Sequence, residues 1–212
     1  MPSTANGHLD CLQALCSKSP NHLNSKDEDG LTPLSWAVIN EHEFIVQGIV
    51  EQEGVDVASQ DREKRTAMSH AAELGKKPII NSLHRCGRRL VSMTDENGLT
   101  PLFWAAENGY FDTVSLFIEG LNCQLDSTNT MSGRTLIAHV AKVGHVDVAK
   151  YLLDSEKVDP FAKDYDEETA LTLAVDSGNK DMVEFLSHCP NPRKAGSIYG
   201  HALLLAMNPK LQ

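Results

Sequence analysis

Five threonines recur along this 212-residue chain at nearly equal intervals. They are Thr32, Thr66, Thr100, Thr135 and Thr169, so the gaps by subtraction are 34, 34, 35 and 34 residues. A fixed period of this size indicates stacked structural repeats. Such an array shares its buried apolar surface between neighbouring units and usually works as an extended surface.

The residues around each threonine predict a helix that begins there. A threonine hydroxyl accepts a hydrogen bond from an otherwise unpaired backbone N–H, which makes it a good helix N-cap. Pro33 and Pro101 fall on the first helical position, where the missing N–H costs nothing. Small or β-branched residues stand five positions after each threonine and would let helices approach closely: Ala37, Ala71, Ala105, Val140 and Ala174. A helix-ending glycine stands nine positions after four of the threonines: Gly75, Gly109, Gly144 and Gly178.

A second helix and a polar connector complete each unit. An apolar stretch with helical spacing follows the glycine, as in Val146, Val148, Ala149, Leu152 and Leu153, and this spacing gives one buried face. The connectors carry Asp, Asn, Ser and Gly, which suit turns or short hairpins. Each unit is therefore predicted to be a helix, a tight turn, a second helix and a finger-like connector.

This pattern resembles the ankyrin repeat, whose T-P-L-H-x-A motif and period of roughly 33 residues are distinctive. The likeness is clearest in TPLSWA at 32–37 and TPLFWA at 100–105. The LSWA variant at 34–37 and the DPFAKD stretch at 159–164 are similar to fungal ankyrin arrays. The resemblance implies an all-α solenoid of helix-turn-helix units with short hairpin or turn fingers.

The repeat spacing also predicts the organisation of the chain. Residues 27–189 are expected to form five ankyrin repeats, at about 27–60, 61–94, 95–129, 130–163 and 164–189. Residues 1–26 are expected to form an N-terminal half-repeat or cap, and 190–212 a linker followed by a C-terminal capping helix.

Several residues depart from the family pattern. Glu41 stands where a glycine is usual, so the pattern does not fix the end of that helix. Lys64 and Glu167 replace the hairpin glycine, and we expect their fingers to bend differently. No unit has the usual histidine three residues after the threonine, so the imidazole bond that stabilises the loop is expected to be missing. The connector from Leu121 to Gly133 has one extra residue.

Composition excludes several classes of function. The net charge of −10 and a pI near 5.3 oppose non-specific nucleic-acid binding and favour a basic or neutral protein partner. No stretch resembles a signal peptide or a membrane span. The cysteines lack any C-x-x-C pair, so free thiols in the cytoplasm or nucleus are expected, with no disulfide framework, metal site or cofactor: Cys11, Cys16, Cys86, Cys123 and Cys189.

The resemblance implies that a partner binds in the concave groove between fingers and inner helices. The residues expected there are Trp36, Asn40, Arg62, Arg65, His70, Glu73, Leu74, Asn97, Leu99, Trp104, Glu107, Asn108, Arg134, His139 and Tyr165. Affinity is expected to come from Trp36 and Trp104, since aromatic residues are enriched at binding hot spots. Selectivity is expected from finger charges that alternate as acidic, mixed, acidic, basic and acidic.

A row of ring side chains stands four residues after the first four threonines: Trp36, His70, Trp104 and His139. One hypothesis makes this row part of a protein-binding surface, and another packs the tryptophans between helices. A third makes it a groove for a small molecule or for acid–base catalysis by His70, Glu73, His139 and Glu107. No Ser-His-Asp, H-E-x-x-H, Walker or G-x-G-x-x-G motif supports catalysis. The favoured function is therefore non-catalytic protein recognition.

Two further interpretations stay open. A basic cluster lies within one unit and suits either an acidic partner or phosphate, or a solvated convex face: Lys76, Lys77, Arg85, Arg88 and Arg89. Because the pattern begins inside a repeat, the chain could also be a structural segment of a larger sensor protein.

Overall fold

The computed structural model describes residues 23–125, 128–155 and 157–189, and within them the helices come in stacked pairs. The pairs are α2 (Pro33–Ile39) and α3 (Glu43–Val50), α4 (Ala67–Glu73) and α5 (Lys77–Cys86), α6 (Pro101–Glu107) and α7 (Phe111–Ser115), α8 (Leu136–Val143) and α9 (Val146–Asp154), and α10 (Ala170–Asp176) and α11 (Lys180–Ser187). A 3-10 helix, η2 (Arg88–Ser92), follows α5, and a π-helical turn, η3 (Leu116–Gly120), continues α7.

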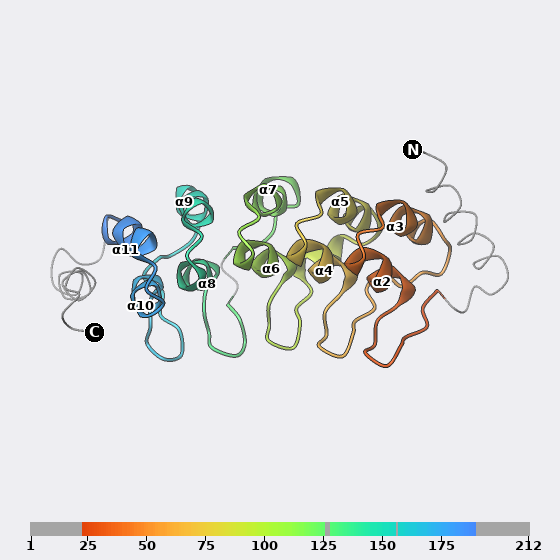
Figure 1. Ribbon diagram of the computed structural model, residues 1–212, viewed down its shortest axis with the longest axis horizontal. Coiled ribbons are helices and arrows are strands. Elements are labelled where there is room, and N and C mark those ends of the chain that lie inside the picture. Colours follow the sequence, from red (N-terminus) through yellow and green to blue (C-terminus); the bar gives the residue numbers. More distant parts are fainter. Residues whose placement is uncertain (1–22, 126–127, 156, 190–212) are drawn as a thin grey trace.

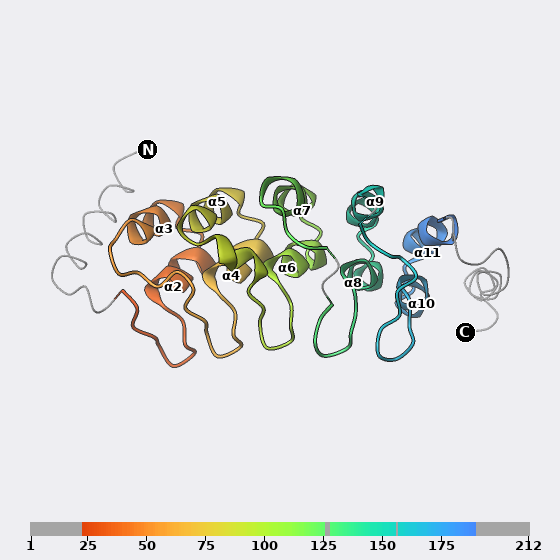
Figure 2. The same cartoon turned by 180° about the vertical axis from the view of Figure 1, so that it is seen from behind.

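The inner helices, the outer helices and the fingers form three parallel rows along the molecule. Figure 1 shows the inner helices α2, α4, α6, α8 and α10 in a middle row, the outer helices in a row above it, and the fingers below. Figure 2 shows the same order from behind. The prediction of an all-α solenoid with finger-like connectors is therefore confirmed.

The inner helices begin at the predicted threonines. The hydroxyls of Thr32, Thr66, Thr135 and Thr169 each accept a hydrogen bond from the amide three residues later, at 3.2–3.4 Å. Thr100 is an exception, because the amide of Phe103 instead donates to the Thr100 carbonyl oxygen at 3.0 Å. Helices α2 and α6 begin at the predicted prolines.

The turn between inner and outer helix is the same with or without glycine. Glu41 adopts the left-handed conformation, with φ of 60°, as Gly75 does with φ of 67°. The Glu41 amide donates to the carbonyl of Val38 at 2.9 Å, matching the bond from Gly75 to Ala72 at 3.1 Å. The first inner helix therefore ends like that of the second unit.

Apolar packing runs without interruption along the stack. The five small residues predicted to let helices approach are all buried: Ala37, Ala71, Ala105, Val140 and Ala174. One hydrophobic cluster extends from Leu34 to Leu186 and takes residues from every helix pair. Because each unit buries its apolar face against its neighbours, the fingers are held in a fixed row.

Candidate protein-interaction surface

The fingers and the exposed side of the inner helices form one continuous surface, called here the finger face. Its fingers are residues 27–31, 61–65, 95–99, 129–134 and 164–168. A single backbone hydrogen bond joins each finger to the next: Arg62 N to Asp29 O at 3.0 Å, Glu96 N to Glu63 O at 2.9 Å, Thr130 N to Asn97 O at 3.0 Å, and Tyr165 N to Ser132 O at 2.8 Å. These bonds align the fingers edge to edge.

One acidic or amide side chain folds each finger. In the third finger, Oδ1 of Asp95 accepts hydrogen bonds from the amides of Asn97 and Leu99, both at 2.9 Å. Equivalent bonds reach Asp27, Asp61 and Asp164. In the fourth finger, Asn129 Oδ1 takes this role and accepts from Ser132 and Arg134. These residues were not predicted, although an Asp or Asn five or six positions before each threonine was the available signal.

The expected different bend of the second and fifth fingers is wrong. Lys64 and Glu167 adopt left-handed φ angles of 60° and 62°, as Gly98 does with 78°. Their amides donate to the carbonyls of Asp61 and Asp164, both at 3.1 Å, as in the third finger. The extra residue lies in the fourth finger, where the amide of Gly133 reaches back four residues to Asn129.

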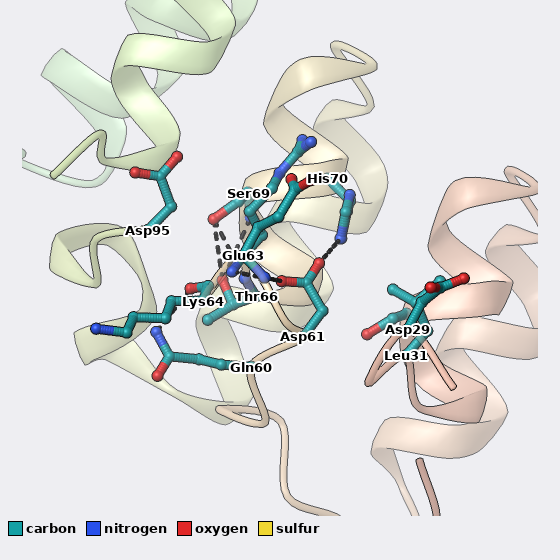
Figure 3. A network of polar contacts seen from close by, with 12 residues as sticks. Asp29, Leu31, Gln60, Asp61, Glu63, Lys64, Thr66, Ser69, His70 and Asp95 are labelled. Carbon is teal, nitrogen blue, oxygen red and sulfur yellow. Dashed lines mark hydrogen bonds and ion pairs between the residues drawn. The ribbon is translucent and has the colours of Figure 1, made fainter. Parts of the chain in front are cut away.

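Three of the four rings in the predicted row connect a finger to its own inner helix. The second carboxylate oxygen of the finger aspartate accepts from Trp36 Nε1 at 2.6 Å in the first finger and from Trp104 Nε1 at 3.1 Å in the third. In the second finger, Asp61 lies 2.9 Å from Nε2 of His70. Figure 3 shows Asp61 between His70 and the backbone of its own finger. The expectation of a missing imidazole bond is therefore wrong for this finger, because the bond comes from one position later.

Trp36 and Trp104 differ in what they leave exposed. The side chain of Trp36 is 47% exposed, and its indole N–H holds the pKa of the Asp27 carboxyl below its ordinary value. Trp104 is half-buried and carries the guanidinium of Arg65 on its ring, 4.2 Å from the centroid. Only Trp36 thus keeps a large free ring surface.

The two histidines of the row lie against carboxylates. His70 is only 8% exposed, and its Nδ1 is 3.9 Å from Glu73. Burial, with help from the nearby Arg65 charge, lowers the pKa of His70 despite Asp61 and Glu73. His139 Nε2 lies 3.2 Å from Glu107 Oε2, although the geometry is that of an ion pair and not of an aligned hydrogen bond. The polar contact with His139 is the largest influence on Glu107, and it outweighs burial and lowers the pKa of that carboxyl.

This geometry gives no support to the catalytic alternative. Acid–base catalysis needs a histidine nitrogen within reach of substrate, whereas both nitrogens of His70 face carboxylates. A hollow of about 820 Å³ does exist, but it lies between α9 and α11, away from the row of rings.

Some residues predicted to bind a partner are buried inside the stack. Leu99 is 6% exposed and Arg65 is 9% exposed, and the Arg65 guanidinium pairs with Glu73. Arg134 is half-buried, with Nε 3.0 Å from Asp164 and Nη2 3.3 Å from Glu168. The expectation that these residues face a partner is therefore corrected for Leu99, Arg65 and the equally buried His70.

The other predicted residues stay at the surface to different degrees. Exposed members are Trp36, Asn40, Arg62, Asn108 and Tyr165. Half-buried members are Glu73, Leu74, Asn97, Trp104, Glu107, Arg134 and His139. Two apolar residues outside the predicted set are also exposed on this face, Met131 at 71% and Val143 at 41%.

Carboxylates gather at the fifth finger. Oxygens of Asp164, Asp166 and Glu168 lie within 4.8 Å of one another, where the sequence predicted no metal site. Arg134 already bonds Asp164 and Glu168. Burial raises the pKa of Asp164, but the Glu168 amide and Arg134 outweigh it and leave the pKa lowered. Burial, followed by a hydrogen bond with Asp176 and the charge of Asp164, raises the pKa of Glu168.

The basic cluster is on the opposite, convex side and is partly neutralised. Lys76 pairs with Glu41 at 2.8 Å, and Lys77 with Asp112 at 3.4 Å. Arg85, Arg88 and Arg89 are exposed on α5 and η2. The cluster is therefore reduced to three exposed arginines, of which Arg85 donates to Ser82 Oγ at 3.3 Å.

Within the described residues, Cys86, Cys123 and Cys189 are free thiols, and burial raises the pKa of Cys123 to about 11. Cys11 and Cys16 lie outside the described residues, as do most of the expected N-terminal half-repeat and the whole C-terminal cap. In the part of the chain that the structure describes, every helix is too short or too polar to cross a bilayer.

The family model for ankyrin repeats (three copies) matches residues 1–61, 45–129 and 117–194. The chain belongs to the ankyrin repeat family. Ankyrin repeats generally mediate protein–protein interaction.

Three curated relatives illustrate where such arrays occur. The chain is 24% identical over 197 residues to ankyrin repeat protein nuc-2 of Neurospora crassa, covering 92% of the chain and 18% of that protein. It is 25% identical over 223 residues to the human NAD-capped RNA hydrolase NUDT12, covering 95% of the chain and 46% of that protein. It is 29% identical over 122 residues to the probable 26S proteasome regulatory subunit p28 of Saccharomyces cerevisiae, covering 57% of the chain and 53% of that subunit. The chain thus spans little more than half of these relatives at most.

Proposed function

We propose that this ankyrin array is a non-catalytic protein-interaction module and that its partner binds across the finger face. The observation that carries the proposal is the double restraint on the fingers: each is folded by its own Asp or Asn and bonded to its neighbour through the backbone. A surface fixed in this way loses little conformational entropy when a partner binds.

The fingers offer a partner a patterned set of charges. The first finger presents Glu28 and Asp29, and the second mixes Arg62 and Lys64 with Glu63, all exposed. The third finger presents Glu96, and the fifth presents Asp166 and Glu167. The tip of the fourth finger is uncharged, because Arg134 turns toward Asp164 and Glu168. This excess of acid supports a basic or neutral partner, and mixed signs support selection of one partner over others.

The large hydrophobic residues exposed on the finger face are Trp36 at one end and Met131 with Tyr165 at the other. Partly solvated aromatic residues are the usual anchors of such interfaces. Free thiols at Cys86, Cys123 and Cys189 support a reducing compartment, the cytoplasm or nucleus. The hydrolase and proteasome roles belong to the named relatives and are not proposed for this chain.

Site-specific photo-crosslinking tests the proposal. A photoreactive amino acid would replace Tyr165, 70% exposed on the finger face, or Phe44, 61% exposed on outer helix α3. Crosslinked proteins from the source cell would then be identified by mass spectrometry. We expect one defined partner from position 165 that is absent from position 44. Crosslinks that arise only from position 44 would place the partner on the convex side and reject the proposal.

A further inference from the structure

We propose that the end of the finger face formed by the last two fingers, α8 and α10 receives an arginine or lysine of the partner beside an apolar residue. This inference rests on the proposed function and adds to it the chemistry of the partner segment. We call this region the terminal patch. Its residues are Met131, Val143, Tyr165, Asp166, Glu168 and Asp176.

The terminal patch has an exposed apolar part that the neighbouring fingers hold in place. Met131 is 71% exposed, Tyr165 is 70% exposed, and Val143 is 41% exposed. The Tyr165 ring packs over the backbone of the fourth finger so closely that a Cβ on Gly133 would lie 2.5 Å from its carbons. The Tyr165 amide also donates to the Ser132 carbonyl at 2.8 Å. A ring fixed in this way offers contact area, and a face for a cation, at little entropic cost.

The acidic part of the terminal patch is short of positive charge. Asp164, Asp166 and Glu168 lie together, and after burial the neighbouring Asp176 also raises the pKa of Glu168. Arg134 is the cation that bonds this group within the described residues, and its contacts go to Asp164 and Glu168. The neighbouring Lys163 pairs instead with Glu167 at 2.5 Å.

The second repeat shows what the fifth repeat lacks. Arg65 stands just before the threonine of that repeat and Glu73 seven residues after it, and the two form an ion pair. The Arg65 guanidinium also stacks on the ring of Trp104 in the next repeat. The same two positions of the fifth repeat hold two acids, Glu168 and Asp176. A guanidinium from the partner would supply the positive charge that Arg65 supplies in the second repeat. A planar guanidinium can also bond two carboxylates at once.

A peptide titration against the full chain tests the inference. Fluorescein-labelled peptides of about twelve residues would carry arginine and leucine in a Gly-Ser background, with one matched peptide replacing arginine by glutamate and another replacing leucine by serine. Fluorescence anisotropy would give each dissociation constant at fixed ionic strength. We expect the arginine–leucine peptide to bind tightest, and the Glu168→Gln/Asp176→Asn double variant to weaken it about tenfold or more.

The control removes the same amount of charge from the fourth and fifth units on the convex side. Asp154→Asn/Glu184→Gln neutralises two exposed carboxylates of α9 and α11, and we expect it to change the dissociation constant less than about twofold. Equal loss in both double variants would show that the peptide follows net charge, and would overturn the inference. Thermal melts would confirm that both double variants are folded.

Two further outcomes separate this inference from the proposed function. If the partner crosslinked at position 165 stays bound to the Glu168→Gln/Asp176→Asn variant, the finger face is the binding site but the basic side chain is not its ligand. If sedimentation shows a dimer that this variant dissociates, the patch binds a second copy of the chain, and the inference is rejected.

Discussion

At the scale of the residue, each finger is folded by the side chain at its base, which is an aspartate in four fingers and Asn129 in the fourth. Asp95 is 5% exposed, and its carboxylate accepts two amides of its own finger and the indole of Trp104. Hydrogen bonds to a charged acceptor are stronger than neutral ones, and each unpaired buried donor is unfavourable. A small polar residue therefore decides whether the tip of the finger is ordered.

Replacing Asp95 should separate the roles of its two oxygens. Asp95→Ala leaves three donors unpaired, and we expect a loss of roughly 2–4 kcal/mol in the free energy of unfolding. Asp95→Asn should lose about half as much, because Asn129 already folds the fourth finger through its amide oxygen. Urea denaturation measures both variants, and hydrogen exchange of the Asn97 and Leu99 amides locates the effect. An unchanged urea midpoint for Asp95→Ala would refute this role.

His70 should make stability depend on pH near neutrality. Burial first, and the Arg65 charge second, place the pKa of His70 below its ordinary value of 6.5. The folded state then binds the proton less readily than the unfolded state, so protonation favours unfolding. The contribution is fully present above pH 6.5 and is lost as the pH falls from 6.5 toward the lower folded-state pKa.

The variant His70→Gln tests this sign. Glutamine keeps an N–H donor for Asp61 but does not titrate. We therefore expect the wild type to lose more stability than His70→Gln between about pH 7.5 and pH 5.5, measured as the shift in guanidinium midpoint. The reverse order, with the variant losing more, would mean that the folded state stabilises the imidazolium.

At the scale of the element, the four fingers of equal length share one backbone path whatever residue stands at the turn. Lys64 and Glu167 accept left-handed φ angles of 60° and 62°, which are unfavourable for residues with a Cβ. The neighbouring finger, the buried Asp and the inner helix together restrain the turn more strongly than this local preference opposes it. Stacking thus overrides the residue type at this position.

Two opposite substitutions should show the size of that strain. We expect Lys64→Gly to stabilise the protein by up to about 1 kcal/mol, since glycine adopts this φ without a clash. Gly98→Ala should destabilise it by more than about 1 kcal/mol, because its Cβ would lie 2.6 Å from the Thr130 amide nitrogen. Thermal denaturation gives both values. Stabilisation by Gly98→Ala would contradict the described path of the third finger.

At the scale of the whole molecule, the side-chain pairs between units described above join nearest neighbours. Arg62 pairs with Asp29 across the first two fingers, and Arg134 with Asp164 across the last two. The His139–Glu107 ion pair links the third and fourth units. Because coupling runs only between nearest neighbours, damage at one end should reach the other end weakly.

The two tryptophans make this testable, since they report on the first and third units. Leu173 is 3% exposed in α10, and Leu173→Ala should remove about 2–5 kcal/mol from the last unit. We expect urea unfolding followed by circular dichroism to begin earlier, while the midpoint followed by tryptophan fluorescence moves little. Coincident curves from the two probes would show that the stack unfolds as one cooperative body.

The sequence by itself determined the fold, because the 34-residue period together with the T-P-L pattern at 32–34 and 100–102 matches the ankyrin unit. The threonine caps, the small residues at helix contacts and the turn glycines are local rules that need no tertiary information. Fingertip residues such as Tyr165 were also recognisable, because their position in the repeat places them at the surface.

Only the tertiary structure decided which side chains of the finger face are available to a partner. Trp104 and His70 look like contact residues in sequence, yet each donates to or faces the aspartate nine residues earlier. Leu99 and Arg65 hold the position before their threonines, as Glu168 does, yet they are buried by the particular neighbours beside them. The physical reason is that exposure and charge pairing in a stack are set across units some 34 residues apart, by side-chain size and sign on both sides of each contact.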